Sequence, residues 1–187
     1  MNGFRIALMD ELEKQFSGKL IEKAVVLGKI GDSWKVRSNS LCKCNKPGVW
    51  ILYGKTRRNS RDIFPLEVGQ VSDMASEICK DIGYIVRDYN YKIISEDKRP
   101  KQFKWSTQLY ITEDSRDLDK YKDIAHKYEY LYFDAYVDQE ETSRREERQN
   151  LEIALAVSSK ALYWYGFGKE KTRALDLAKK KYHDLYK

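Results

Sequence analysis

The chain has 187 residues and a formal net charge of +6, with 42% hydrophobic and 34% charged residues. This length suits a single domain over 1–187 with a real hydrophobic core, and the apolar share excludes wholesale disorder. The three cysteines and two histidines do not have the spacing of a disulfide framework or a tetrahedral zinc site, which favours free thiols. No apolar run approaches the length of a membrane span, so we expect a cytoplasmic protein without a membrane partner.

Apolar periodicity and turn residues divide the chain into helices and strands. The first half is predicted to form, in order, a helix over 4–23, strands over 24–30, 33–37, 49–53 and 63–71, and a helix over 73–82. Ser72 is the expected N-cap of that last helix. A β-rich insertion is predicted over 83–111, with strand-like pieces at 84–86, 91–94 and 103–111. The second half is predicted to form a helix over 118–128, a strand over 129–138, a long helix over 143–163 and a basic C-terminal helix within 169–187.

Positive charge is concentrated in two segments. The segment 42–61 holds six basic residues and no acid, and the segment 160–187 holds eight basic and three acidic residues. Between them, 113–152 holds thirteen acids and seven bases. Segregated basic patches attract polyanions, which predicts double-stranded DNA as a partner. The residues expected to bind DNA are Arg57, Arg58, Arg61, Lys179, Lys180 and Lys181.

Short motifs lie on consecutive predicted elements in the middle of the chain. One strand opens with GVW at 48–50, the next contains EVG at 67–69, a helix follows directly, and a later helix carries Glu152. This order resembles the GIY-YIG nuclease superfamily over about 47–166. The resemblance implies an α+β fold in which helices flank a small central β-sheet, with extra helices at both ends of the chain.

The resemblance also implies a metal-dependent phosphodiesterase site. Glu152 corresponds to the helical glutamate that holds a divalent metal in the family, and Glu67 would be a second ligand. Mg²⁺ or Mn²⁺ would bind there, because hard cations prefer carboxylate oxygen. The candidate catalytic residues are Glu152, Tyr53, Lys55 and Trp50.

This sequence departs from the family pattern at three positions. Trp50 and Glu67 stand where the family has its two motif tyrosines, and Glu77 stands where the following helix has an arginine. A cation on the phosphate stabilises the transition state, so a glutamate there reverses the favourable charge. Rescue would need a cation from 55–58 to reach the phosphate. The departures predict an atypical or degenerate site, with any cleavage weak and dependent on Glu152.

Several of these residues also have purely structural explanations. Trp50 and Tyr53 lie in an apolar strand, where packing is the commoner role of an aromatic side chain. Glu152 lies four positions after Arg148 and would form a helix-surface ion pair with it. Arg57 belongs to a loop and would simply be solvated.

Three functions fit the sequence. The first is an atypical metal-dependent endodeoxyribonuclease, in which Glu67 and Glu152 converge near Lys55. The second is a DNA-binding protein on a catalytically degenerate version of the fold, with its basic segments on one face. The third is a non-catalytic interaction protein, such as a mobile-element (phage) inhibitor of a host nuclease or CRISPR system, in which acidic segments imitate DNA phosphates.

Overall fold

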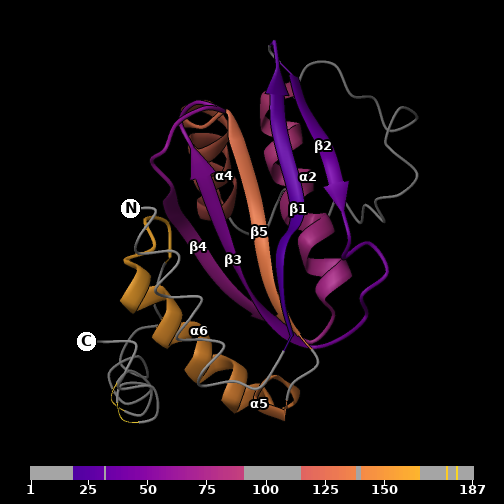
Figure 1. Cartoon of the computed structure of the whole chain (residues 1–187), viewed down its shortest axis with the longest axis vertical. Helices are drawn as coiled ribbons and strands as arrows, with labels where there is room; N and C mark the ends of the chain where they lie inside the picture. The colour runs from indigo at the N-terminus through magenta and orange to yellow at the C-terminus, as the bar shows by residue number, and fades with distance from the viewer. Residues whose placement is uncertain are drawn as a thin grey trace.

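The computed structural model describes residues 19–31, 33–90, 115–137 and 140–164, together with Asp176 and Lys180. Within these ranges, five strands form one antiparallel sheet in the order β2-β1-β5-β3-β4 (Figure 1). The strands are β1 (Lys19–Ile30), β2 (Ser33–Asn39), β3 (Gly48–Lys55), β4 (Phe64–Val71) and β5 (Tyr130–Val137). The helices are α2 (Met74–Asn90), α4 (Ser115–Lys127), the short α5 (Glu140–Ser143) and α6 (Arg145–Ser159). The predicted α+β class with a central sheet is therefore confirmed.

β5 is the middle strand, and it pairs with β1 on one side and with β3 on the other. The strands predicted over 49–53, 63–71 and 129–138 are thus neighbours in one sheet, as expected. β3 is buried at seven of its eight positions, because it has a strand on each edge and helices on each face. β1 and β2 contain the strands predicted over 24–30 and 33–37, and they extend the sheet beyond the part that the motif pattern covers.

The two faces of the sheet carry different helices. α2 and α4 pack on one face, the α2/α4 face, where they share a core with Trp50 and Leu52 of β3. α6 packs on the other, the α6 face, where it shares a core with Val49, Ile51 and Tyr53. This alternation follows from the pleat of a strand, whose successive side chains point to opposite faces. In Figure 1, α6 runs along β4 at the lower left of the view, and α2 and α4 lie behind the strands.

The helix predicted over 4–23 is wrong at its end, because residues 19–23 belong to β1. β1 pairs with β5 along this stretch, and sheet pairing overrides the helical spacing of the apolar residues. A bulge here gives Lys23 a φ of 46° and lets its backbone N–H donate to Asp134 Oδ1 of β5 at 2.5 Å. Residues 4–18 lie outside the described part of the chain.

α2 extends to Asn90 and so includes the first part of the insertion predicted over 83–111. The strand-like piece predicted over 84–86 is wrong, because these residues are helical. Tyr84 stacks on Tyr121 of α4 at a centroid distance of 5.4 Å, and this contact stabilises the added turns. The remainder of the insertion lies outside the described residues.

The long helix predicted over 143–163 is divided into α5 and α6, which are separated at Arg144. α6 ends earlier than predicted, because Lys160 takes the left-handed conformation with a φ of 55°. Two backbone N–H groups after the last turn donate to α6 carbonyl oxygens and so satisfy the end of the helix. The chain leaves α6 in the direction of β4.

An edge strap, residues 161–164, runs along the outer edge of β4. Leu162 N–H donates to Pro65 O at 3.2 Å, and Tyr163 N–H donates to Leu66 O at 2.7 Å. An edge strand otherwise presents open backbone groups that can pair with another chain. The strap therefore covers part of the β4 edge and connects the α6 face to it.

Two further helices were predicted in the second half of the chain. The helix predicted over 118–128 corresponds to α4. Of the basic C-terminal helix predicted within 169–187, only Asp176 and Lys180 are described, and both have helical backbone. Within the described ranges, no helix combines the length and apolar character needed to cross a membrane.

The N-terminus of α2 is capped by Asp73 and not by the predicted Ser72. Asp73 Oδ1 accepts a hydrogen bond from the backbone N–H of Ser76 at 3.2 Å. The first two N–H groups of the helix donate to carbonyl oxygens of the loop 40–47. The cap therefore joins this loop to α2, so α2 begins at a fixed point relative to β3.

Replacing Asp73 with alanine is expected to destabilise the protein by about 1 kcal/mol, because the N-cap carboxylate satisfies a helix N–H and complements the helix dipole. Ser72→Ala is the matched control, since Ser72 is exposed, and it should change the unfolding free energy by less than about 0.5 kcal/mol. Chemical denaturation measures both. Equal losses in the two variants would contradict this cap.

Candidate functional site

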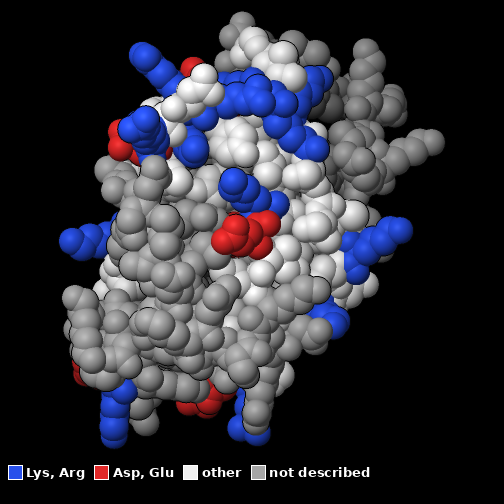
Figure 2. All heavy atoms as spheres, in the orientation of Figure 1, with Lys and Arg blue, Asp and Glu red and all other residues white. Residues whose placement is uncertain are grey.

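Lysine and arginine side chains gather at the end of the sheet where β3 ends and β5 begins, in the upper part of the view in Figure 2. The loop between β3 and β4 supplies Arg57, Arg58 and Arg61, all of them exposed. Lys55 ends β3 directly before this loop. The predicted DNA-binding arginines therefore lie together with the predicted catalytic lysine.

A row of residues crosses the α6 face at this end. The register places Gly28 of β1 opposite both Lys35 of β2 and Tyr130 of β5. Tyr130 in turn lies opposite Lys55, whose Nζ is 5.9 Å from the centre of the Tyr130 ring. Because directly paired residues share a face, these positions form one row. Arg37 of β2 adds a cation to the row, since its side chain packs against Gly28.

Six cations of the sheet and its loop form this basic end: Lys35, Arg37, Lys55, Arg57, Arg58 and Arg61. The other two cations of the segment 42–61, Lys43 and Lys46, lie in the loop 40–47, at the opposite end of the sheet. Of the C-terminal basic run 179–181, only Lys180 is described, and it is exposed.

The candidate catalytic and metal-binding residues are divided between the two faces. Trp50 and Glu67 lie on the α2/α4 face. Tyr53, Lys55 and Glu152 belong to the α6 face. The two carboxylates predicted to share a metal ion therefore approach β4 from opposite sides of the sheet.

The two aromatic candidates are packed in the core. Trp50 is 3% exposed, and its ring meets Phe133 edge to face at a centroid distance of 5.5 Å. The same ring lies over Gly69 of β4, where an added Cβ would come within 2.4 Å of it. Tyr53 is 1% exposed and stacks on Tyr132 at 5.2 Å. These environments fit the structural explanation of both aromatic residues.

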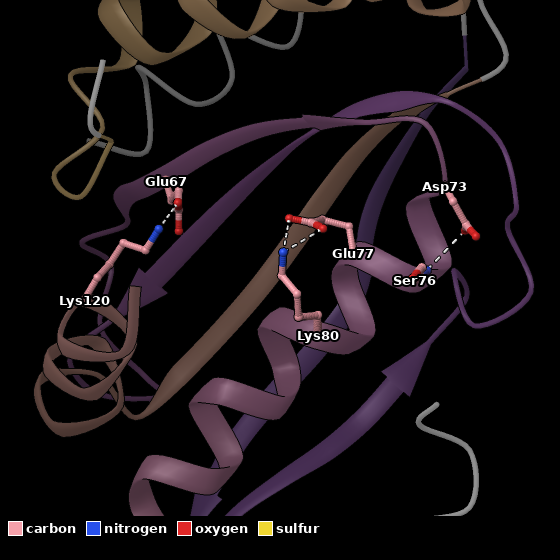
Figure 3. Close-up of polar contacts among 6 residues, drawn as sticks. All are labelled: Glu67, Asp73, Ser76, Glu77, Lys80 and Lys120. Atoms are coloured by element: carbon pink, nitrogen blue, oxygen red, sulfur yellow. Dashed lines mark hydrogen bonds and ion pairs between the residues drawn. The ribbon is translucent and has the colours of Figure 1, made fainter. Parts of the chain in front are cut away.

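Glu67 forms a buried ion pair with Lys120 of α4 (Figure 3). Glu67 lies opposite Leu52 of β3, which fixes its position on the α2/α4 face. Its side chain is 11% exposed and that of Lys120 is 6% exposed. Lys120 Nζ also lies 4.8 Å from the centre of the Tyr121 ring. Lys120 therefore binds the Glu67 carboxylate oxygen that would otherwise be available to a metal ion.

Two more acids, both from α2, lie near this pair. Glu77 forms an ion pair with Lys80 at 2.9 Å (Figure 3). Asp81 is 2% exposed and accepts a hydrogen bond from Tyr121. Burial, followed by the negative charges of Glu77 and Glu67, raises the pKa of Asp81 well above its ordinary value. This environment therefore disfavours the charged form of Asp81 relative to water.

Glu152 lies near the middle of α6 and is 6% exposed. Trp164 of the edge strap donates its Nε1 hydrogen to Glu152 Oε1 at 3.0 Å. Burial raises the pKa of Glu152 to about 7, the hydrogen bond from Trp164 acts in the opposite direction, and the charge of Glu67 adds to the rise. Glu152 therefore changes its charge close to neutral pH.

The structural explanation of Glu152 as a partner of Arg148 does not match the observed contacts of that arginine. Arg148 Nε donates to Gln70 Oε1 at 3.1 Å, which ties α6 to β4. Arg148 Nη1 donates to the carbonyl oxygens of Thr142 and Ser143, both at 2.9 Å. Burial, and not a surface ion pair, determines the environment of Glu152.

Within the described ranges, no group of three or more His, Cys, Asp or Glu side chains is placed to hold a metal ion. Mg²⁺ prefers several oxygen ligands in a regular arrangement. Glu67 is already neutralised by a lysine and lies across the sheet from Glu152, so the donors at Glu67 do not fit such an ion. A metal at Glu152 remains a prediction of the family resemblance.

Sequence reasoning missed Asp81, Lys120 and the row around Tyr130. Asp81 had a detectable signal, because it directly precedes the inward-facing Ile82 on an amphipathic helix. Lys120 likewise precedes the inward-facing Tyr121. The row had no signal in the sequence, because it depends on the register between strands that are distant in the chain.

The chain matches no protein-family model, no curated protein and no solved structure. The resemblance to GIY-YIG nucleases therefore rests on the sequence pattern alone.

Lys120→Met is expected to lower the unfolding free energy by about 3 kcal/mol, because it leaves the Glu67 carboxylate buried without its counter-charge. The double variant Glu67→Gln/Lys120→Met removes both charges and should recover most of this loss. Lys127→Met is the control, since its side chain is 60% exposed. Urea denaturation gives the comparison, and a double variant as unstable as the single one would contradict the pairing.

Glu152→Gln is expected to stabilise the protein above pH 7 and to change little below pH 4.5. The folded pKa of Glu152, about 7, exceeds its ordinary value of 4.5. Ionisation therefore opposes folding, and the stability of the wild type falls as pH rises between these values. The glutamine keeps the acceptor for Trp164 and should gain up to about 3 kcal/mol at pH 8. Unfolding free energies at several pH values measure the effect, and parallel pH profiles would contradict it.

Proposed function

We propose that this chain binds double-stranded DNA through the basic end, on a fold that resembles GIY-YIG nucleases with a degenerate site, in which Glu152 is kept and the two tyrosines and the arginine are replaced. The observation that supports this proposal best is the grouping of six cations from β2, β3 and the β3–β4 loop at one end of the sheet. A DNA duplex carries one negative charge per about 1.7 Å of its axis, and cations that neutralise phosphates release its counterions.

The loop between β3 and β4 suits contact with a phosphate backbone. A turn holds it, in which Ser60 N–H donates to Arg57 O at 2.9 Å and Asp62 N–H donates to Ser60 Oγ at 3.0 Å. The three arginines around this turn are exposed, so their guanidinium groups are available to phosphate oxygens. Arginine matches phosphate well, because its fork of donors binds two oxygens at once.

The charge distribution also gives the protein an orientation on DNA. Glu146 and Glu147 lie in the first turn of α6, at the end of the sheet opposite the basic end. These two acids stand among the cations Lys43, Arg144 and Arg145, whereas the segment 55–61 holds four cations and no acid, so electrostatic steering favours approach by the basic end.

Cleavage has no part in this proposal. The positions where the family has its tyrosines and arginine are taken by Trp50, Glu67 and Glu77. Trp50 is buried in the core, and each glutamate is paired with a lysine. These side chains stabilise the α2/α4 face, and no group among them is left to orient a phosphate by positive charge.

The variant Arg57→Ala/Arg58→Ala/Arg61→Ala is expected to weaken binding to a fluorescent DNA duplex about tenfold or more at low salt. It should also reduce the log–log salt slope by about 2 to 3 units, because each neutralised phosphate contributes about 0.9. Fluorescence anisotropy over a salt series measures both quantities. The variant Lys179→Ala/Lys180→Ala/Lys181→Ala tests in the same way whether the second basic segment contributes.

The control is Lys43→Ala/Arg144→Ala/Arg145→Ala. It also removes three positive charges, but from exposed positions at the opposite end of the sheet. Its affinity should stay close to that of the wild type. Equal weakening by both variants, or an affinity that does not depend on salt, would overturn the assignment. Chelator-sensitive nicking of plasmid with Mg²⁺ or Mn²⁺ that Glu152→Gln abolishes would favour the nuclease instead. Absence of DNA binding together with inhibition of a nuclease would favour the interaction protein.

A further inference from the structure

Tyr130 lies at the centre of the row that crosses the basic end, on the middle strand of the sheet. Tyr130 is partly exposed. Tyr132 supports it in the next row, with a centroid distance of 5.9 Å, and Tyr132 itself stacks on Tyr53 at 5.2 Å. Because the two supporting rings are buried, Tyr130 is held in place before any ligand arrives.

Lys55 Nζ lies over the Tyr130 ring at 5.9 Å from its centre, so a base that stacks on this face takes the place of the ammonium group. Lys55 lies on β3, and Lys35 lies on β2, two strands away on the other side. At about 4.8 Å per strand, the row from Lys35 to Lys55 spans about 14 Å. The long side chains of both lysines reach inward from these strand positions, so the ring offers a base a surface to stack on and the lysines offer its flanking phosphates positive charge.

Gly28 lies in the row between Tyr130 and the cations of β2, and it has no side chain to fill the space above it. It has ordinary strand backbone, since it is not among the residues with positive φ. A Cβ at this position would lie 2.6 Å from Arg37 Nε, so the side chain of Arg37 occupies the space that the glycine leaves. The glycine therefore serves the placement of the guanidinium group beside Tyr130.

We propose that Tyr130 is a stacking platform for one unpaired base of DNA, with Arg37 and Lys35 on one flanking phosphate and Lys55 on the other. This site rests on the proposed DNA-binding function, and it adds that an unpaired stretch next to a duplex is the preferred substrate. Bases inside a duplex are stacked on both sides and cannot present a face to the ring. An unpaired base can, and stacking on an aromatic ring adds to the attraction between charges.

The test compares a blunt DNA duplex with the same duplex carrying a short single-stranded dT extension. The extension is expected to raise the affinity of the wild type about fivefold or more. Tyr130→Leu should remove this gain without changing the affinity for the blunt duplex, and Tyr130→Phe should retain it. Gly28→Ala should also reduce the gain, because it displaces Arg37 without changing any charge.

A second measurement uses the wild type alone and does not depend on the folding of a variant. A duplex whose extension contains 5-iododeoxyuridine should photo-cross-link to Tyr130, as identified by mass spectrometry. The platform would be overturned if cross-links formed only to other residues. It would also be overturned if the extension brought no gain in affinity while the blunt duplex bound normally. Either result would leave the proposed function intact. Failure of the blunt duplex to bind would overturn the proposed function, and a free dT oligonucleotide that binds through Tyr130 would then still support the platform. Tighter binding of a uridine RNA extension would overturn DNA as the ligand.

Discussion

The register of β5 between β1 and β3 is the constraint on which both the core and the surface of this protein depend. β5 carries aromatic residues at alternate positions, and a slip of one residue would exchange the two faces. In the observed register, Leu131 and Phe133 join α2 and α4 in one core, while Tyr132 and Tyr136 join α6 in the other. The same register brings Tyr130 between β2 and β3 cations.

Charged side chains occur in two different environments in this protein, buried ion pairs and an exposed group of cations. On the α2/α4 face, acids and lysines are buried together, and Glu67 and Lys120 compensate each other where water is excluded. At the basic end, positive charges are exposed beside one another. Their repulsion opposes folding slightly, and it favours the binding of a polyanion. The three positions that depart from the nuclease pattern, Trp50, Glu67 and Glu77, lie on the α2/α4 face, whereas Glu152 belongs to the α6 face. On that face Glu67 and Glu77 each form an ion pair with a lysine.

The sequence was sufficient for the elements with strong local patterns. The alternation in 129–138 and the apolar run in 49–53 predicted β5 and β3 correctly. The errors lie where tertiary contacts override local preference: β1 begins inside a helical pattern because β5 pairs with it, and α2 continues because Tyr84 meets Tyr121. The placement of the candidate site could not be predicted, because the face on which a strand or helix residue lies depends on register and packing between distant segments.

The hydrogen bond between Lys23 and Asp134 joins residues that are 111 positions apart, and this separation has a consequence for how the chain folds during synthesis. The hairpins β1–β2 and β3–β4 involve nearby residues, so they can form early. The strand between them is made last, and closing so long a loop is slow. Until β5 leaves the ribosome, the edges of β1 and β3 that β5 will pair with have no partner strand. This interval is when the nascent chain is most exposed to mispairing and most in need of a chaperone.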